Sequence, residues 1–297
     1  MKRLIGPALI LLCTVIWGSA FVAQKLGAGH FGPFAICCYR NLLAGLFLWG
    51  GVRLRDRQFK VERTNGRTVY LGGTLSGIVL FASMLAQQLG IERTTPGISA
   101  FLTANYVLFV PVFAWLFVGR RPGAGIWFGV ALALAGTYFL SFSSAEGDGF
   151  GLGAGEAWTL ACAVLFAVQI LVVDRFARVC DVLRFSMVQM FAAGLVALPF
   201  VFLPSELART SWDSFLKGIP ALVYLGIFSS GIAYTLQNLG QARTPPALAA
   251  IIMSMESVFG ALFGWLLLGD LMTVRQLFGC ALVFSAVVLS QLIPSRR

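Results

Sequence analysis

The feature that most constrains this chain is an internal repeat with an offset of 150 residues. The segment QQLGIERTTP at positions 87–96 returns without a gap as QNLGQARTPP at positions 237–246. Of the 33 positions from Gln87 to Gly119, 12 are identical in the second copy. Leu and Ala matches arise by chance in an apolar chain, but a shared Arg-Thr-x-Pro and a shared Trp-Leu in one register do not. We therefore predict two related halves, residues 1–145 and residues 146–297.

The scarcity of charge indicates that the solvent of this chain is lipid. Hydrophobic residues make up 58% of the sequence and charged residues 11%, whereas about a quarter of the residues in a soluble domain are charged. A membrane-spanning helix needs about 20 mainly apolar residues. Ten such spans are predicted at 4–24, 33–52, 68–91, 95–117, 123–141, 154–174, 182–203, 217–240, 245–268 and 274–293. The expected fold class is an all-α membrane protein with ten transmembrane helices.

The distribution of lysine and arginine predicts how these spans are oriented. Sixteen of these residues fall on the side that holds both termini, five fall on the other side, and Arg40 lies inside a span. Because cytoplasmic loops carry the excess of positive charge, both termini are expected in the cytoplasm. Five spans per copy is an odd number, so the second copy must cross the bilayer in the opposite sense. The prediction is two inverted five-helix repeats, an architecture that many secondary transporters share.

Several other classes of protein are excluded by residue type. The six cysteines include no Cys-x-x-Cys pair, and no Walker-type loop is present, so neither a metal site nor a cofactor is expected. The net charge of +10 lies in the loops between spans, which indicates a lipid bilayer as partner and no nucleic acid. An intramembrane enzyme is disfavoured because the one histidine, His30, falls in an outer loop and no span holds two deep acids.

Two ionisable residues inside the spans are the main functional candidates, because such residues are rare and unfavourable in lipid. Arg40 lies about 10 Å from the outer end of its span, at 1.5 Å per residue. In a functional role, Arg40 would bind a substrate carboxylate. In a structural role, it would hydrogen-bond neighbouring carbonyl groups or extend to the outer surface of the membrane. Glu256 lies near the middle of its span, where burial disfavours the anion. It is a proton carrier, a counter-ion to a cationic substrate, or the structural partner of Arg40.

The remaining candidates are polar or aromatic side chains deep in the spans. With Arg40 and Glu256, the predicted substrate-binding residues are Trp17, Ser19, Asn105, Tyr106, Phe166, Gln169, Ser230 and Tyr234. Structural alternatives stay open: Trp17-Gly18 as a helix-packing pair, an interhelical hydrogen bond for Asn105 and Tyr106, and a hydroxyl bonding back to its own helix for Ser230. The small residues of the span at 123–141 predict close helix packing, with no role in a site.

The order of several short motifs resembles the drug/metabolite transporter superfamily in its EamA-type branch. The matching pieces are Trp17-Gly18, Arg40, Arg93-Thr94-Thr95-Pro96, Val110-Pro111-Val112-Phe113, SMESVF at 254–259 and WLLLGD at 265–270. The chain departs from the family at Arg120 and Asp270, where Glu is frequent, and at Ser257, where Pro is usual, so the proline that would kink span nine is missing. The resemblance implies a central cavity lined mainly by spans one, three, four, six, eight and nine.

The resemblance also implies a secondary carrier, since the branch moves amino acids, other small metabolites, amines and drugs, often outward. We expect an alternating-access exporter of a small amine-bearing or zwitterionic metabolite, such as an amino acid, in the inner or plasma membrane. Glu256 would balance the amine or carry a coupled proton, and Arg40 would meet the carboxylate. The alternatives are proton-coupled uptake of a cationic amine and, from another class, a lipid scramblase or a non-transporting membrane partner. The oligomeric state is left open, with a homodimer as one form.

Overall fold

The computed structural model describes residues 4–59, 65–93, 99, 102–119, 121–141, 153–209, 211–268 and 273–292, and all regular structure in these ranges is helical. The first half contains α1 (Ile5–Ala28), α2 (Pro33–Gln58), α3 (Gly66–Ile91), α5 (Tyr106–Val118) and α6 (Ala124–Ser141). The second half begins with α7 (Ala154–Phe176), α8 (Val182–Val201), α9 (Pro204–Leu207) and α10 (Trp212–Val223). It continues with the π-helix η2 (Tyr224–Ala233), α11 (Tyr234–Gln241), α12 (Pro246–Met253), α13 (Met255–Leu268) and α14 (Val274–Leu292). The predicted repeat boundary at 145/146, Pro96, Arg120 and Asp270 lie outside the described residues.

Seven helices in the described ranges are long and apolar enough to cross a membrane. Three further apolar helices, Leu102–Phe117, Ala124–Phe139 and Leu277–Leu289, are shorter. The predicted all-α class is confirmed, whereas the count of ten spans stays a prediction. The span predicted at 217–240 begins earlier, because α10, η2 and α11 form one continuous helix from Trp212 to Gln241.

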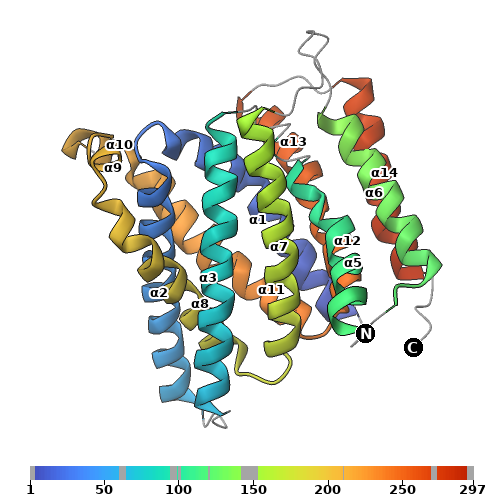
Figure 1. Cartoon of the computed structure of the whole chain (residues 1–297), viewed down its shortest axis with the longest axis horizontal. Helices are drawn as coiled ribbons and strands as arrows, with labels where there is room; N and C mark the ends of the chain where they lie inside the picture. The colour runs from blue at the N-terminus through green and yellow to red at the C-terminus, as the bar shows by residue number, and fades with distance from the viewer. Residues whose placement is uncertain are drawn as a thin grey trace.

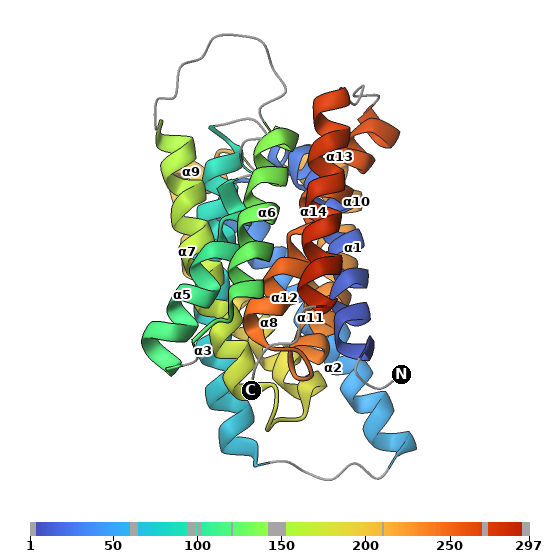
Figure 2. The same ribbon diagram turned by 90° about the vertical axis from the view of Figure 1, so that its right-hand side faces the viewer.

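The most extensive helix pairings all join the first half of the chain to the second. Helix α2 packs along α8, α3 lies between α7 and α8, α6 packs along α14, and α1 packs against α13. Figure 1 shows α6 and α14 together at one side of the bundle, and Figure 2 shows the same pair from the front. The two halves are therefore interleaved, and the centre of the molecule is built from both.

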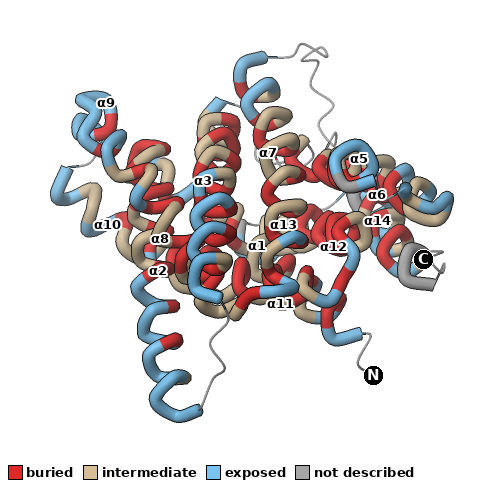
Figure 3. Tube along the Cα trace, turned by 60° about the horizontal axis from the view of Figure 1, so that its bottom comes forward, coloured by how far each residue is buried: buried red, intermediate tan, exposed pale blue. Residues whose placement is uncertain are grey.

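The outward faces of the helices carry large apolar side chains. Exposed examples are Trp49, Leu71, Phe117, Trp265 and Phe284. In Figure 3 the buried residues form the inward faces of the helices, and exposed residues follow the periphery. A soluble protein rarely exposes so many large apolar side chains, so this distribution fits a bundle that is surrounded by lipid.

Glycines permit the close helix contacts that enclose the centre. A Cβ atom on Gly136 of α6 would lie 2.7 Å from Val283 Cγ2 and 2.8 Å from Gly279 O, both on α14. The predicted packing role of this span therefore has a structural basis. On α1, a Cβ atom on Gly18 would lie 2.8 Å from the backbone nitrogen of Gly260 in α13.

Two helices of the core are interrupted at places that lie within one residue of each other in the repeat register. A break at Asn105 separates residues 102–104 from α5, and a break at Ser254 separates α12 from α13. At each break the side chain bonds the carbonyl three residues back: Asn105 Nδ2 donates to Leu102 O at 3.1 Å, and Ser254 Oγ donates to Ile251 O at 2.7 Å. The second break forms even though Ser257 stands where the family usually has a proline. This interruption therefore does not require a proline, and a side-chain hydrogen bond accompanies it instead.

Candidate functional site

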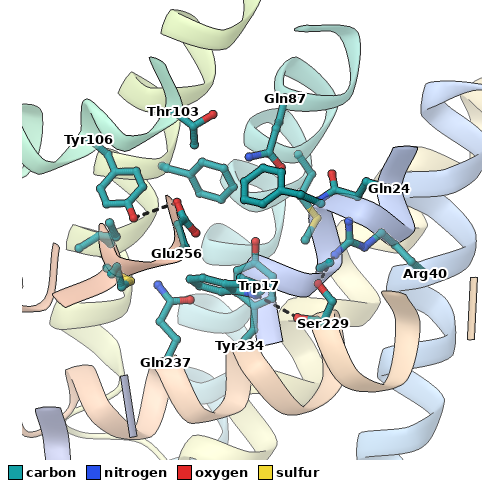
Figure 4. A pocket seen from close by; sticks show the side chains of 16 residues that line it. Trp17, Gln24, Arg40, Gln87, Thr103, Tyr106, Ser229, Tyr234, Gln237 and Glu256 are labelled. Carbon is teal, nitrogen blue, oxygen red and sulfur yellow. Dashed lines mark hydrogen bonds between the residues drawn. The ribbon is translucent and has the colours of Figure 1, made fainter. Parts of the chain in front are cut away.

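A central cavity of about 510 Å³, including space open to solvent, lies among helices from both halves. The polar residues that line it are Gln24, Arg40, Gln87, Thr103, Ser229 and Gln237, together with the acid Glu256. Its aromatic residues are Trp17, Phe21, Tyr106, Phe166 and Tyr234. Figure 4 shows these side chains converging from several helices on one space.

Glu256 and Tyr106 form a hydrogen bond across the cavity. Tyr106 Oη donates to Glu256 Oε1 at 3.0 Å, and the two residues are 150 positions apart, so they occupy the same place in the two copies. Both residues lie just after a helix break. Tyr106 directly follows the break at Asn105, and Glu256 lies two residues after the break at Ser254. The repeat thus places one phenol and one carboxyl group side by side in the centre of the bundle.

Arg40 lies in the same cavity and is held by two hydroxyl groups. Its Nε donates to Ser230 Oγ at 2.9 Å and its Nη2 donates to Ser229 Oγ at 2.9 Å. The side chain is 4% exposed. Within the described part of the chain neither Arg40 nor Glu256 takes part in an ion pair. The structure therefore does not support the alternative in which Glu256 is the structural partner of Arg40.

Both serines belong to η2, a π-helix of ten residues. π-Helical turns are rare and frequently found at functional sites, because they shift the direction in which side chains point. Here successive residues Ser229 and Ser230 both reach Arg40. Trp17 also contacts this segment, since its Nε1 donates to Ser229 O at 3.2 Å. The π-helix therefore positions the guanidinium group and the indole ring together.

The aromatic residues form one wall of the cavity. The rings of Trp17 and Tyr234 have centroids 4.8 Å apart at an interplanar angle of 58°. Phe166 of α7 also lines the space. Aromatic faces attract cations, so this wall suits an amine. Both interpretations of Trp17-Gly18 hold at once, because Trp17 lines the cavity while Gly18 packs against α13.

Four of the predicted site residues do not line the cavity. Ser19 Oγ donates to Ile16 O and also bonds Tyr224 Oη, and Asn105 bonds its own helix. Ser230 acts through Arg40, and Gln169 accepts from Gln237 Nε2 at 3.4 Å. Trp17, Arg40, Tyr106, Phe166, Tyr234 and Glu256 are brought together as lining residues.

Sequence reasoning missed several lining residues, of which Gln87 and Gln237 are the most informative. They are identical repeat partners, 150 positions apart, and both line the cavity. A polar residue that is kept in both copies was the available indication of a site. Gln237 Oε1 is buried and has no hydrogen-bond partner in the structure. In the described residues no group of three or more His, Cys, Asp or Glu side chains is arranged to hold a metal ion.

An apolar helical bundle that encloses a polar, charged cavity is an arrangement found in membrane transport proteins. Comparison with known families makes this specific: the EamA-like transporter family matches residues 4–142 and again residues 153–292. The chain therefore belongs to the EamA-like transporter family, and the family unit occurs in it twice. It is a multi-pass membrane protein.

Known proteins support this assignment over nearly the whole length. An uncharacterised transporter of Archaeoglobus fulgidus is 29% identical over 98% of this chain and 87% of that protein. The uncharacterised inner membrane transporter YedA of Escherichia coli is 26% identical over 93% of this chain and 87% of that protein. One crystal structure has a TM-score of 0.76 at 22% sequence identity, covering 96% of each chain, and so shares the fold.

Proposed function

We propose that this protein is a secondary active transporter that exports a small amine-bearing or zwitterionic metabolite, such as an amino acid, by alternating access. The observation that carries the proposal is that buried Arg40 and buried Glu256 share one cavity without an oppositely charged partner in the described chain. Leaving a charge buried and unpaired is unfavourable by several kcal/mol. A ligand that carries both charges would relieve this cost at both residues.

The proposed architecture is ten spans in two inverted repeats, with both termini in the cytoplasm of a cell membrane. Gly90, near the end of α3, packs on Gly155 at the start of α7, whereas its repeat partner Gly240 packs on Gly6 at the start of α1. The starts of α7 and α1 lie at opposite ends of the bundle (Figure 1). The start of α1 and the end of α14 lie toward one end (Figure 2), and the excess of positive charge predicts that this end is cytoplasmic.

In the proposed mechanism, different site residues bind different groups of the ligand. Arg40 would bind the carboxylate, with its guanidinium group oriented by Ser229 and Ser230. Trp17 and Tyr234 would face the amine, which gains about 0.5–2 kcal/mol over an aromatic ring. Glu256 would balance the amine or exchange it for a proton, so that substrate and proton compete for one carboxylate. A gradient would then supply the driving force.

Flux into proteoliposomes of purified protein tests the proposal. Wild type is expected to exchange a labelled zwitterion, and Arg40→Gln should abolish that exchange. A quaternary amine needs no arginine, so its transport by Arg40→Gln should be retained. Equal loss of both fluxes would leave Arg40 with a folding role alone and would contradict the proposal. Movement of labelled lipid without any soluble substrate would identify a scramblase instead.

Proton-coupled uptake of a cationic amine is the second candidate. It is favoured by the arrangement of Glu256 and the aromatic wall, which together suit a cation without help from Arg40. The two candidates differ in direction and in the need for a carboxylate. An imposed inward proton gradient that accumulates an amine inside right-side-out vesicles would favour uptake over export.

A further inference from the structure

A groove of about 790 Å³, which includes the open space in front of it, lies on the surface of the bundle between α3 and α8. The two helices pack along one another (Figure 1). Helix α8 lines the groove with apolar side chains alone, among them Met187, Phe191 and Leu195, whereas α3 contributes Tyr70 and Thr74. Tyr70 is 63% exposed and Leu195 is 56% exposed, so the groove opens outward, toward the surrounding lipid. We call it the α3–α8 groove.

One end of the α3–α8 groove is polar. A Cβ atom on Gly73 would lie 2.8 Å from Val188, and one on Gly77 would lie 2.7 Å from Ala192, so α3 and α8 run parallel. Their starts therefore lie together. The two polar lining residues belong to the first three turns of α3, which places them at this end. Figure 2 shows the start of α3 toward the end of the bundle that holds the chain termini.

Both helices also bring an arginine to this end. Residues three, four and seven apart share one face of a helix, so Arg67 lies on the face of α3 that carries Tyr70 and Thr74. In the same way, Arg184 lies on the face of α8 that carries Met187. The polar end of the groove is therefore also its basic end.

The two arginines differ in their partners. Arg184 pairs with Asp56, and its Nε lies 3.7 Å from Asp181 Oδ2. Arg67 is exposed, and it forms no ion pair within the residues that the structure describes. Its guanidinium group is left to bind an anion from outside the chain, close to the starts of two helices whose dipoles favour negative charge.

The surroundings limit what can fill this groove, because a bilayer offers only lipid or another membrane protein. In a twofold dimer the same surface of each copy faces the other, so groove would face groove and space would remain between them. A lipid acyl chain fits an apolar groove, and basic sites at the cytoplasmic side of transmembrane helices bind anionic headgroups. A lipid with a negative headgroup therefore matches both parts of the groove.

We propose that the α3–α8 groove is a binding site for an anionic phospholipid. Its phosphate binds Arg67, and the hydroxyl groups of Tyr70 and Thr74 donate to its phosphate or ester oxygens. One acyl chain lies along α8 from Met187 to Leu195, a length of about 12 Å at 1.5 Å per residue. Under the proposed sidedness this lipid belongs to the cytoplasmic leaflet. The site is independent of what the central cavity transports.

Mass spectrometry of intact protein–lipid complexes tests the proposal on the full-length protein. Phosphatidylglycerol and phosphatidylcholine with identical acyl chains would be titrated separately. A basic side chain near the membrane surface changes the affinity for anionic lipid about fivefold. We therefore expect one phosphatidylglycerol to bind with a Kd about fivefold lower than that of phosphatidylcholine.

Arg67→Gln tests the headgroup end and should bring the two Kd values together. Arg57→Gln is the matched control, because Arg57 is also exposed and lies at the end of α2, outside the groove lining. It removes the same charge and should keep the wild-type preference for phosphatidylglycerol.

Thr74→Trp tests the groove itself, because a large ring there would occupy the space of the acyl chain. Binding of both lipids should be lost. Leu75→Trp is the matched control, since Leu75 is 43% exposed on the same helix and does not line the groove. It should leave both Kd values unchanged. The Tm of each variant without added lipid should equal that of wild type, because both positions are exposed.

Four results would overturn the proposal. Equal loss of preference in Arg67→Gln and Arg57→Gln would mean that general surface charge attracts the lipid. Wild-type binding by Thr74→Trp would remove the acyl chain from the groove. Displacement of phosphatidylglycerol by an equal concentration of glycerol phosphate would identify a site for free phosphate. Conversion of a dimer to a monomer by Thr74→Trp, with no lipid preference in wild type, would place a second copy in the groove. None of these results bears on the transport proposal, which flux measurements test separately.

Discussion

Glu256 and Tyr106 show how a duplicated chain can place different chemistry at equivalent positions. The two positions correspond across the repeat, and one holds a carboxyl group while the other holds a phenol that donates to it at 3.0 Å. Two acids at these places would repel one another at this distance. The difference between the copies therefore gives the cavity a single acidic group with a hydrogen-bond donor already in position.

The Glu256–Tyr106 pair predicts that proton-coupled accumulation of the substrate can be separated from its equilibrium exchange. In Glu256→Gln the side chain keeps its shape but no longer exchanges a proton, so accumulation against a gradient should be lost while equilibrium exchange is retained. Counterflow and gradient-driven uptake in the same proteoliposomes would measure the two activities. Tyr106→Phe is the matched control, because it removes one hydrogen bond, worth about 1.5–3 kcal/mol to a charged group, and leaves the carboxyl group in place. Unchanged accumulation by Glu256→Gln would refute a coupling role.

At the scale of helices, the ends of α2 and α8 are joined by an ion-pair network. Arg55 of α2 donates to both oxygens of Asp181, with Nη1–Oδ1 at 2.9 Å and Nη2–Oδ2 at 2.6 Å. Asp181 is also the N-cap of α8, where its Oδ1 accepts from the backbone nitrogens of Leu183 and Arg184. Burial alone would raise the pKa of Asp181, but the hydrogen bonds from Arg55 and from the backbone outweigh it and lower that pKa.

The lowered pKa of Asp181 predicts how stability depends on pH. A carboxylate with a lowered folded-state pKa contributes its full stabilisation above its unfolded pKa and loses it as the pH falls through the folded value. We expect Asp181→Asn to lower stability by about 1–2 kcal/mol near neutral pH. The difference in Tm between wild type and variant should shrink as the pH falls toward about 3.

Thermal unfolding of detergent-solubilised protein over that pH range would check this prediction. Asp213→Asn is the control, because Asp213 pairs with Lys217 at 2.7 Å while its side chain is 74% exposed. An exposed pair of this kind contributes little, so its removal should leave the Tm unchanged at every pH. A gap between wild type and Asp181→Asn that is constant with pH would contradict the assignment.

The helices also show what could be predicted from sequence and what could not. Hydropathy and the repeat predicted a helical bundle, and depth in the spans predicted Arg40, Tyr106 and Glu256 as cavity residues. The π-helix at Ser229 was not predictable, because a hydropathy pattern does not distinguish a π-helical segment from an α-helical one. The break at Ser254 was not predictable either, since no proline marks it and a serine hydroxyl accompanies it.

Neutral amides were the other omission, for a related reason. Gln24, Gln87 and Gln237 stand toward the ends of their helices, where a polar side chain usually faces water or lipid headgroups. Only the packing of α1, α3 and α11 turns these amides toward one cavity. The residue pattern within one helix does not indicate whether such an amide faces the cavity. The identity of Gln87 and Gln237 across the repeat was the one indication that they do.

On the scale of the whole molecule, the proposed inverted repeats make a prediction about sidedness. Single cysteines placed next to Arg93 and next to Arg243 should react with an impermeant thiol reagent from opposite faces of the membrane. The control is a variant of the same protein without its six native cysteines. Labelling of intact cells and of inverted vesicles would give the two accessibilities. Reaction of both positions from the same face would eliminate the inverted arrangement.

The interleaving of the two halves has a consequence for how the chain can be divided. Because α2, α3 and α6 find their largest partners beyond residue 153, neither half alone can cover its own inner surface. Two polypeptides produced by a cut between Ser141 and Gly153 should be degraded when made singly and should co-purify when made together. Such complementation would mean that the covalent link between the halves is dispensable. The contacts between the facing helices of the two fragments would then be enough to assemble the molecule.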